Sequence, residues 1–386
     1  MKIGIFGDSF LPIYDGVGRV MKAYAENLSH LGHEVYVISP KYMDTSNLSL
    51  GYEIISFNSH KLIKGLPYRI GSPNLDTKFK KKIKDIEFDI IHIHSPFCTG
   101  PLGLKIAKKR KIPCVGTFHT KFYDDVLSIT HSRLLAKITA RFTGNSYSKC
   151  TEVWAVSKGS AETLKNYGCK KEILVMPNGC EHRDLPDKEL QDKVREKYNI
   201  KSGIFTALFV GRLNWNKGIR KCIDAVKILK DREKQIQFII AGQGPHENEI
   251  KALIHKYNLD DNIHLIGFVS DREELDCLYS ICDLFLLPSI YDNSPLVTKE
   301  AAMMKRCSLV IKNSSASEEI IDNENGLVSI DDDLSISNKI QEFMMLDKEK
   351  REKMEENAFR TIPVSWSKIC KDVEQRYIKL VSEFDQ

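Results

Sequence analysis

Long apolar runs are missing from this sequence of 386 residues: none approaches the roughly 18 residues that a membrane-spanning helix needs. The first residues, Met1 to Phe10, also lack the long apolar core of a secretory signal peptide and carry Asp8 early. We therefore expect a cytoplasmic protein, with any membrane contact made from the surface.

Metal-ligand and disulfide patterns are also missing. The ten cysteines form no CxxC pair, and the spacing of Cys277 and Cys282 is not that of a metal site, so free thiols are expected. His92 and His94 alternate on a strand without a third ligand, and the acidic run at 331–333 lies outside any motif. We interpret both as structural or surface features and expect no metal and no cofactor.

A strong charge of one sign is absent as well. The net charge of +5 is modest and does not indicate a nucleic-acid partner. Lysines gather at 78–84 and 105–111, and such runs form either solvated surfaces or a face for anionic lipid.

What is present is a repeated alternation of short β-branched runs and helical patterns, which predicts an α/β protein with parallel sheets. A polar stretch between residues 183 and 203 separates two such series, so we expect two doubly wound domains with a cleft between them. The predicted domains are 1–185 and 200–363, and residues 364–386 form a helix that packs back on the first domain. Strands are expected at 3–6, 35–39, 53–57, 89–94, 114–119, 152–156, 205–211, 236–241, 263–267, 283–288 and 309–311.

Three loops have the composition of a site for a phosphorylated ligand. Gly16, Val17 and Gly18 follow the first strand and open the first helix, where backbone N–H groups favour an anion. Arg212 and Lys217 follow the first strand of the second series and can converge on a diphosphate. Gly242 and Gly244 permit close approach of a base or ribose. The alternative for the loop at Gly16 to Gly18 is a plain tight turn. For Arg212 and Lys217 it is two solvated charges that flank a helix cap, and for Gly242 and Gly244 it is a simple strand-to-helix turn.

The segment 288–302 is the most informative. Asp292 and Glu300 are eight residues apart, one on a loop and one on a helix, and carboxylates accept hydrogen bonds from sugar hydroxyls. The helix start at Pro295, Leu296 and Val297 can meet a phosphate, although Pro295 has no N–H. A helix cap with a surface Glu is the alternative.

The order of these motifs resembles glycosyltransferase family 4. The resemblance covers nearly the whole chain and includes Gly116-Thr117-Phe118-His119-Thr120, Ala155-Val156-Ser157 and Pro177-Asn178-Gly179. It implies the GT-B fold of two facing Rossmann-like domains and a retaining transfer of a sugar from a nucleotide diphosphate donor. It also implies that Arg212 and Lys217 bind the diphosphate, that Glu300 holds the ribose, and that Asp292 and His119 lie near the transferred sugar.

The sequence departs from the family pattern twice. Asp292 stands where the family usually has Glu, which puts the identity of the sugar in doubt. Lys305-Arg306-Cys307 stand where the family commonly has a small residue and Gly.

The segment after His119 resembles the acceptor loop of diacylglycerol glucosyltransferases, which implies roles for Lys121, Tyr123 and Asp125. A helix is expected next, with Arg133, Lys137 and Arg141 on one flank beside an apolar stripe of Leu134, Leu135, Ile138 and Phe142. That pattern suits a helix lying in an anionic headgroup layer, whereas the alternative is a helix whose stripe packs on its own sheet.

Taken together, the sequence predicts a hexosyltransferase that moves glucose from a UDP-linked donor to a lipid such as diacylglycerol, at the inner face of the cell membrane. A transferase that builds capsule or cell-wall polysaccharide on a glycan or carrier-lipid acceptor is the alternative within the family. A nucleotide-sugar epimerase and an inactive sugar-nucleotide binding protein are the alternatives of other classes.

Overall fold

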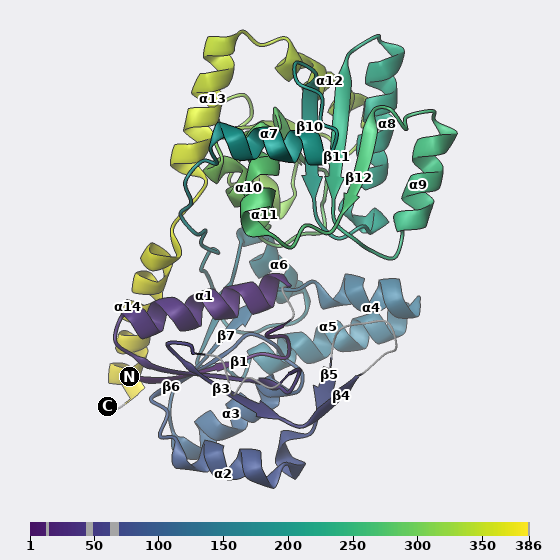
Figure 1. Ribbon diagram of the computed structural model, residues 1–386. Coiled ribbons are helices and arrows are strands. Elements are labelled where there is room, and N and C mark those ends of the chain that lie inside the picture. Colours follow the sequence, from purple (N-terminus) through teal and green to yellow (C-terminus); the bar gives the residue numbers. More distant parts are fainter. Residues whose placement is uncertain (13–14, 44–48, 62–68, 385–386) are drawn as a thin grey trace. The chain divides into compact units, whose positions relative to one another are not determined.

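The computed structural model describes residues 1–12, 15–43, 49–61 and 69–384. The chain forms two compact units (Figure 1): the first comprises Met1–Gly179 with Ser365–Gln386, and the second comprises Cys180–Val364. The chain therefore passes between the units twice, once after Gly179 and once after Val364.

The first unit is built on a seven-stranded parallel sheet in the order β3-β2-β1-β6-β7-β8-β9. Its strands are short and largely buried, and a small antiparallel pair, β4 and β5, stands apart from the sheet. The strands are β1 (Lys2–Phe6), β2 (Glu34–Pro40), β3 (Glu53–Phe57), β4 (Ser59–Lys61), β5 (Arg69–Gly71), β6 (Ile90–Ile93), β7 (Cys114–Phe118), β8 (Glu152–Ala155) and β9 (Ile173–Val175).

Amphipathic helices connect these strands. They are α1 (Gly16–His30), α2 (Thr77–Asp85), α3 (Thr99–Arg110), α4 (Phe122–Thr130), α5 (Arg133–Tyr147), α6 (Lys158–Asn166) and, from the other end of the chain, α14 (Trp366–Phe384); a short 3-10 turn, η1, spans Pro73–Leu75. Helix α14 packs against α1 and is held by a bidentate ion pair from Arg376 to Glu152 on β8. The first unit therefore takes its last helix from the far end of the sequence.

The second unit has a six-stranded parallel sheet in the order β12-β11-β10-β13-β14-β15. Its strands are β10 (Phe205–Val210), β11 (Ile236–Ala241), β12 (Ile263–Gly267), β13 (Leu284–Leu287), β14 (Ser308–Ile311) and β15 (Leu327–Ser329). Its helices are α7 (Lys188–Lys197), α8 (Ile219–Asp231), α9 (Glu247–Lys256), α10 (Arg272–Ile281), α11 (Leu296–Met303), α12 (Asp333–Met344) and α13 (Lys348–Thr361), with 3-10 turns η2 (Trp215–Lys217) and η3 (Ser315–Glu318).

The predicted α/β class is confirmed, and most predicted strands agree with the structure to within a residue at each end. The pattern missed β9 and β15, which are three-residue strands at the sheet edges, and the β4–β5 pair. Strands of that length are too short to show a period in the sequence.

The division between the units differs from the predicted one. We expected a linker from 185 to 200, but the structure divides at Gly179 and Cys180. The polar stretch is instead the amphipathic helix α7, which Asp187 caps by accepting from the N–H of Leu190 at 2.8 Å, and which buries Val194 in the core of the second unit. A surface helix that buries only one side chain is polar along most of its length, so its composition resembles that of a linker.

The unusual Lys305 has a geometric explanation. It follows α11 in the left-handed conformation with φ of 55°, which is why glycine suits this position. The N–H of Arg306 donates to the carbonyl of Ala301 at 2.9 Å and that of Lys305 to Ala302 at 3.0 Å, the pattern of a Schellman motif. In return the Lys305 ammonium pairs with Glu356 at 2.9 Å, across a half-exposed surface where such a pair is worth little.

Substituting Lys305→Gly should therefore raise the free energy of unfolding by about 0.5–1 kcal/mol, because relief of the left-handed strain exceeds the lost surface pair. Thermal denaturation of Lys305→Gly and Lys305→Ala would measure this, since the alanine variant loses the same ammonium but keeps the strain. A glycine variant no more stable than the alanine variant would contradict the explanation.

Candidate functional site

The strand order of the sheet in the second unit indicates the edge at which a ligand is expected to bind. Strand β10 lies between β11 and β13, so the chain runs outward in both directions from the β10–β13 pair. In sheets of this kind ligands bind beyond the carboxyl ends of the strands at such a point. The loops that follow β10 and β13 carry Arg212 and Lys217 on one side and Asp292 on the other. The topology thus brings together residues that the sequence separates by about 75 positions.

Glycines allow these loops to approach within backbone contact. A Cβ on Gly242, which has φ of +147°, would lie 1.8 Å from the carbonyl oxygen of Gly211. One on Gly244 would lie 2.2 Å from that of Leu213, and one on Gly218 would lie 2.3 Å from that of Pro288. Gly242 and Gly244 therefore have a packing reason for being glycine, and their contact with a base or ribose stays a prediction.

Lys217 and Asp292 form an ion pair with each other. Each side chain is about one-fifth exposed, and the Lys217 ammonium also lies 5.4 Å from the centre of the Tyr291 ring. The second carboxylate oxygen of Asp292, Oδ2, is buried without a hydrogen bond in the described part of the chain. A cation predicted for a phosphate and a carboxylate predicted for a sugar thus neutralise each other here, while Arg212 on the same loop is exposed.

Helix α11 begins where the sequence predicted. Its N-cap is Pro295, which has no side-chain acceptor, so the N–H groups of Leu296 and Val297 receive no capping bond from it. The partial positive charge of this helix start is therefore left for an acceptor from elsewhere. One turn later, Glu300 is 2% exposed and its carboxylate faces α10.

Sequence reasoning missed the partners of Glu300. Arg272 lies 3.1 Å from its Oε1, and the Tyr279 hydroxyl donates to its Oε2 at 3.0 Å. Asp276 lies 3.3 Å from the Arg272 guanidinium and 3.1 Å from that of Arg183. The signal was present, because Arg272, Asp276 and Tyr279 recur at the i, i+4, i+7 spacing of one helix face. Burial raises the pKa of Asp276, and the two neighbouring arginines oppose that shift.

In the first unit His119 follows β7 and lies beside His92 of β6 and His94, which directly follows β6. Its Nε2 is 2.9 Å from Nδ1 of His94, and the rings of His92 and His94 are 4.0 Å apart. His92 is held by the Tyr377 hydroxyl of α14 at 2.5 Å and by Thr117 at 2.6 Å. Burial lowers the pKa of His119 to about 3, so this imidazole is neutral near pH 7. His92 and His94 thus fix the position of the His119 ring, an arrangement that the spacing in the sequence did not indicate.

The loop at Gly16 to Gly18 carries its own carboxylate. Asp15 caps α1 by accepting from the Gly18 N–H at 2.7 Å and from the Ser9 hydroxyl at 2.7 Å. One of the N–H groups predicted for a ligand is therefore occupied. Gly16 is exposed, and a Cβ there would meet nothing within 4 Å, so its predicted contact with the donor stays a prediction.

Helices α4 and α5 pack against each other after His119. Lys121 is the N-cap of α4, Asp125 lies in its first turn, and the Tyr123 N–H donates to the Tyr167 hydroxyl at 2.9 Å. Arg133, Lys137 and Arg141 are all exposed on α5. We name the adjacent apolar residues the outer stripe, and they are 68%, 48%, 55% and 44% exposed in the order Leu134, Leu135, Ile138 and Phe142.

The outer stripe is not the packed face of α5. That face is formed by small residues and one tyrosine, which lie on the opposite side of the helix: Ala136, Ala140, Thr143, Gly144 and Tyr147. The Phe142 ring stacks with Phe97 at 6.2 Å between centres, and Phe97 is itself 37% exposed. The alternative in which the stripe packs on its own sheet is therefore wrong.

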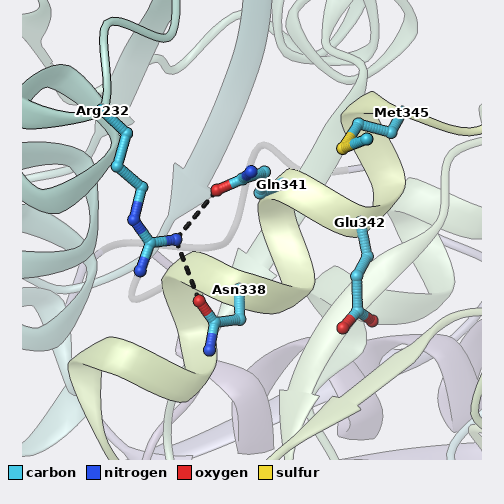
Figure 2. Close-up of a pocket in the computed structure, with 5 residues that line it drawn as sticks. All are labelled: Arg232, Asn338, Gln341, Glu342 and Met345. Atoms are coloured by element: carbon cyan, nitrogen blue, oxygen red, sulfur yellow. Dashed lines mark hydrogen bonds between the residues drawn. The ribbon is translucent and has the colours of Figure 1, made fainter.

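A surface pocket of about 300 Å³ lies elsewhere, between the end of α8 and helix α12 (Figure 2). Arg232 donates there to Asn338 at 2.9 Å and to Gln341 at 2.8 Å. None of the predicted site residues lines it. Arg232 is the C-cap of α8, so the pocket lies at the negative end of the helix dipole, which disfavours an anionic ligand.

The described residues contain no group of three or more His, Cys, Asp or Glu side chains arranged to hold a metal ion. Nor does any helix in the described ranges combine the length and the apolar character that crossing a bilayer requires.

The Lys217–Asp292 pair predicts opposite effects of two substitutions on binding of a nucleoside diphosphate. Lys217→Ala should weaken binding by about 2 kcal/mol, the scale of a charge-assisted contact. Asp292→Asn should leave binding equal or tighter, because it releases Lys217 and removes a negative charge, while turnover with the intact sugar donor falls. Calorimetric titration and steady-state kinetics would measure both.

Lys221 and Asp331 form a second Lys–Asp pair in the same unit, and Lys221→Ala is the matched control, with unchanged binding expected. Weaker binding in Asp292→Asn would contradict a competition between Asp292 and the diphosphate for Lys217.

Two family models match the chain one after the other: Glycosyltransferase Family 4 over residues 14–183 and Glycosyl transferases group 1 over residues 191–361. Among curated relatives, an alpha-monoglucosyldiacylglycerol synthase of Acholeplasma laidlawii is 28% identical over 347 residues, covering 85% of this chain and 84% of the relative. The Streptococcus pneumoniae enzyme of the same name is 25% identical over 306 residues, covering 78% and 69%.

Among solved structures, Anabaena HepE in complex with UDP matches with a TM-score of 0.78 at 18% identity, covering 98% of this chain and 100% of that one. At that identity the likeness shows the fold alone, and the fold is GT-B. With the motif order, the two matched models and the two doubly wound units in agreement, the chain belongs to glycosyltransferase family 4 and is a glycosyltransferase.

Proposed function

We propose that this enzyme transfers glucose from UDP-glucose to diacylglycerol at an anionic membrane surface, with retention of the anomeric configuration. The observation that carries the acceptor is the outer stripe of α5, which is exposed and flanked by Arg133, Lys137 and Arg141. Two relatives named alpha-monoglucosyldiacylglycerol synthase support the same acceptor, and the likeness to a fold neighbour that binds UDP supports the donor.

The physical case for membrane docking is energetic. Four exposed apolar side chains on one side of a helix lose their contact with water when they enter the headgroup layer, and each fully buried leucine contributes about 1.5–3 kcal/mol. Each cation near an anionic surface adds on the order of 1 kcal/mol. Docking through α5 is thus strong enough to be stable and weak enough to be reversible, which suits an enzyme whose acceptor lies in the bilayer.

In the proposed reaction the bond between the anomeric carbon and the diphosphate oxygen breaks, and the electron pair leaves with the diphosphate. Arg212, Lys217 and the N–H groups at the start of α11 stabilise the developing charge. The oxygen of the acceptor hydroxyl forms the new bond to the anomeric carbon on the face that the diphosphate leaves, and the hydroxyl proton passes to the departing diphosphate oxygen. Protein cations serve where a metal ion would serve in other transferases, so we propose that no divalent metal is required.

The donor and acceptor are tested together by incubation of the enzyme with radiolabelled UDP-glucose and mixed vesicles. Label in glucosyl-diacylglycerol is the expected result. Label in an oligosaccharide-linked carrier lipid would favour polysaccharide synthesis instead, and formation of an epimer from the donor alone would favour an epimerase.

Membrane docking predicts a specific loss in the double variant Leu134→Ser/Ile138→Ser. Its partition onto vesicles with phosphatidylglycerol should fall at least tenfold in flotation, because two side chains lose their apolar transfer energy. The matched control is Leu75→Ser/Ile378→Ser, which changes two exposed apolar residues of the same unit outside α5 and should float like the wild type. Equal flotation of the wild type with neutral and anionic vesicles would contradict the electrostatic part.

Metal independence predicts full activity in excess EDTA, measured as initial rate after dialysis against the chelator. Loss of activity that Mg²⁺ or Mn²⁺ restores would show that Arg212 and Lys217 are not sufficient to stabilise the leaving diphosphate.

A further inference from the structure

Two imidazoles of the first unit lie where its topology favours ligand binding. The strand order of this sheet reverses at the β1–β6 pair, so a ligand is expected at the carboxyl ends of these strands. His94 directly follows β6, and His119 directly follows the neighbouring strand β7. His94 is 2% exposed, and its backbone N–H donates to the carbonyl of Phe6 at 2.8 Å. Its ring therefore has a fixed place beside His119.

The two rings share one hydrogen bond. Nδ1 of His94 and Nε2 of His119 are 2.9 Å apart, and the ring planes differ by 17° with 5.1 Å between centres. These nitrogens thus lie close to the line that joins the ring centres, which is the geometry of an in-plane N–H···N bond. Burial lowers the pKa of both rings, that of His119 to about 3, so near pH 7 both are neutral and one nitrogen of each is protonated.

The other nitrogen of His94 indicates which ring donates. Within the described residues, Nε2 of His94 is buried without a hydrogen-bond partner. If His119 donated through its Nε2, His94 would carry its own proton on this nitrogen, as a buried N–H without an acceptor. If His94 donates through Nδ1, its Nε2 is only a lone pair. Buried N–H groups without an acceptor are rarer in proteins than acceptors without a donor, so the second arrangement is favoured.

We infer that His94 is a positioning residue that holds His119 in the tautomer with its proton on Nδ1, so that His119 acts as a hydrogen-bond donor and not as a general base. In this tautomer Nε2 of His119 accepts the His94 proton, and Nδ1 can only donate. Neither nitrogen is then able to take the proton of an acceptor hydroxyl, which in the proposed reaction passes to the diphosphate. The tautomer does not depend on the proposed function; only its effect on transfer rests on it.

The tautomer is measured directly on the full chain by ¹⁵N–¹H correlation NMR of a sample labelled with ¹⁵N in its histidines, at pH 8. Protonated and unprotonated ring nitrogens have distinct signals, and those of His119 are identified by their loss in His119→Gln. In the wild type we expect the proton of each ring, His94 and His119, on Nδ1. The measurement needs neither a nucleotide nor a lipid.

Two substitutions of similar size at His94 should have opposite effects. The side-chain amide of asparagine can donate from near the position of Nδ1, whereas the carboxylate of aspartate can only accept. His94→Asn should therefore keep the His119 proton on Nδ1, and His94→Asp should place a proton on Nε2. Because the loss of a correctly placed donor weakens the site, we expect transfer to be at least tenfold slower in His94→Asp and within about threefold of the wild type in His94→Asn.

The matched control is His33→Asn in the same unit. His33 has a side chain 10% exposed, and its Nε2 lies 2.7 Å from Glu374 of α14, outside the contacts of His119. This variant loses a partly buried imidazole and its partner, as the His94 variants do. It should keep the wild-type tautomer of His119 and the wild-type rate, even where its thermal stability falls as far as theirs.

A wild-type His119 protonated on Nε2 would overturn the inference; the buried N–H of His94 would then be explained by the Tyr24 ring, 5.5 Å away between centres at 80°. An unmoved His119 proton in folded His94→Asp would overturn it as well. Equal transfer rates in the two His94 variants, with the proton moved, would overturn the role of His94 in the reaction. Absence of label in diacylglycerol contradicts the proposed function alone, because the tautomer is measured without substrates. The two failures are thus distinguishable.

Discussion

The second unit depends on one constraint, which is that the loops after β10, β11 and β13 must meet in backbone contact. The Cβ positions of Gly242, Gly244 and Gly218 are already filled by carbonyl oxygens of neighbouring loops, so larger residues there require the loops to separate. This contact brings Lys217 beside Asp292 and sets the start of α11 next to them. Backbone packing of these loops therefore positions the charged groups of the site, independently of the contacts that their side chains make.

The two units treat charge in opposite ways. Around Glu300 and Lys217 the second unit holds cations and carboxylates in compensating pairs, which favours exchange of a protein partner for a charged ligand. In the first unit the groups near His119 are neutral imidazoles and aromatic rings, and burial keeps His119 uncharged. The proposed function assigns binding of the anionic donor to the charged environment and recognition of an uncharged hydroxyl to the neutral one.

Much of this could be predicted from the sequence. The βα rhythm gave the fold class and most strands, and the loops with Arg212, Lys217, Asp292 and Glu300 were identified because glycine, charge and strand ends coincide there. The exposed stripe of α5 was also visible as a pattern, although only the structure shows that small residues such as Ala136 and Ala140 form its packed face.

The rest depends on contacts between residues far apart in the chain. Pairing of Lys217 with Asp292, the approach of Arg183 to Asp276, and the contact of Tyr377 with His92 span 75 to 285 positions and have no local signature. The three-residue edge strands were missed for the opposite reason, because they are too short to show a pattern. The division of the units was misplaced because α7 is polar on most of its surface.

The two passages of the chain between the units make the second unit an insertion in the first. Its ends meet, since the Cys180 N–H donates to the Val364 carbonyl at 2.7 Å. The first unit is left without α14 until residues 366–384 are made, and α14 supplies Tyr377 to His92 and Arg376 to Glu152. On the ribosome, therefore, the second unit has all of its sequence before the first does, and the His92 imidazole of β6 gains the Tyr377 hydroxyl last. The first unit is thus the first to be started on the ribosome and the last to be completed.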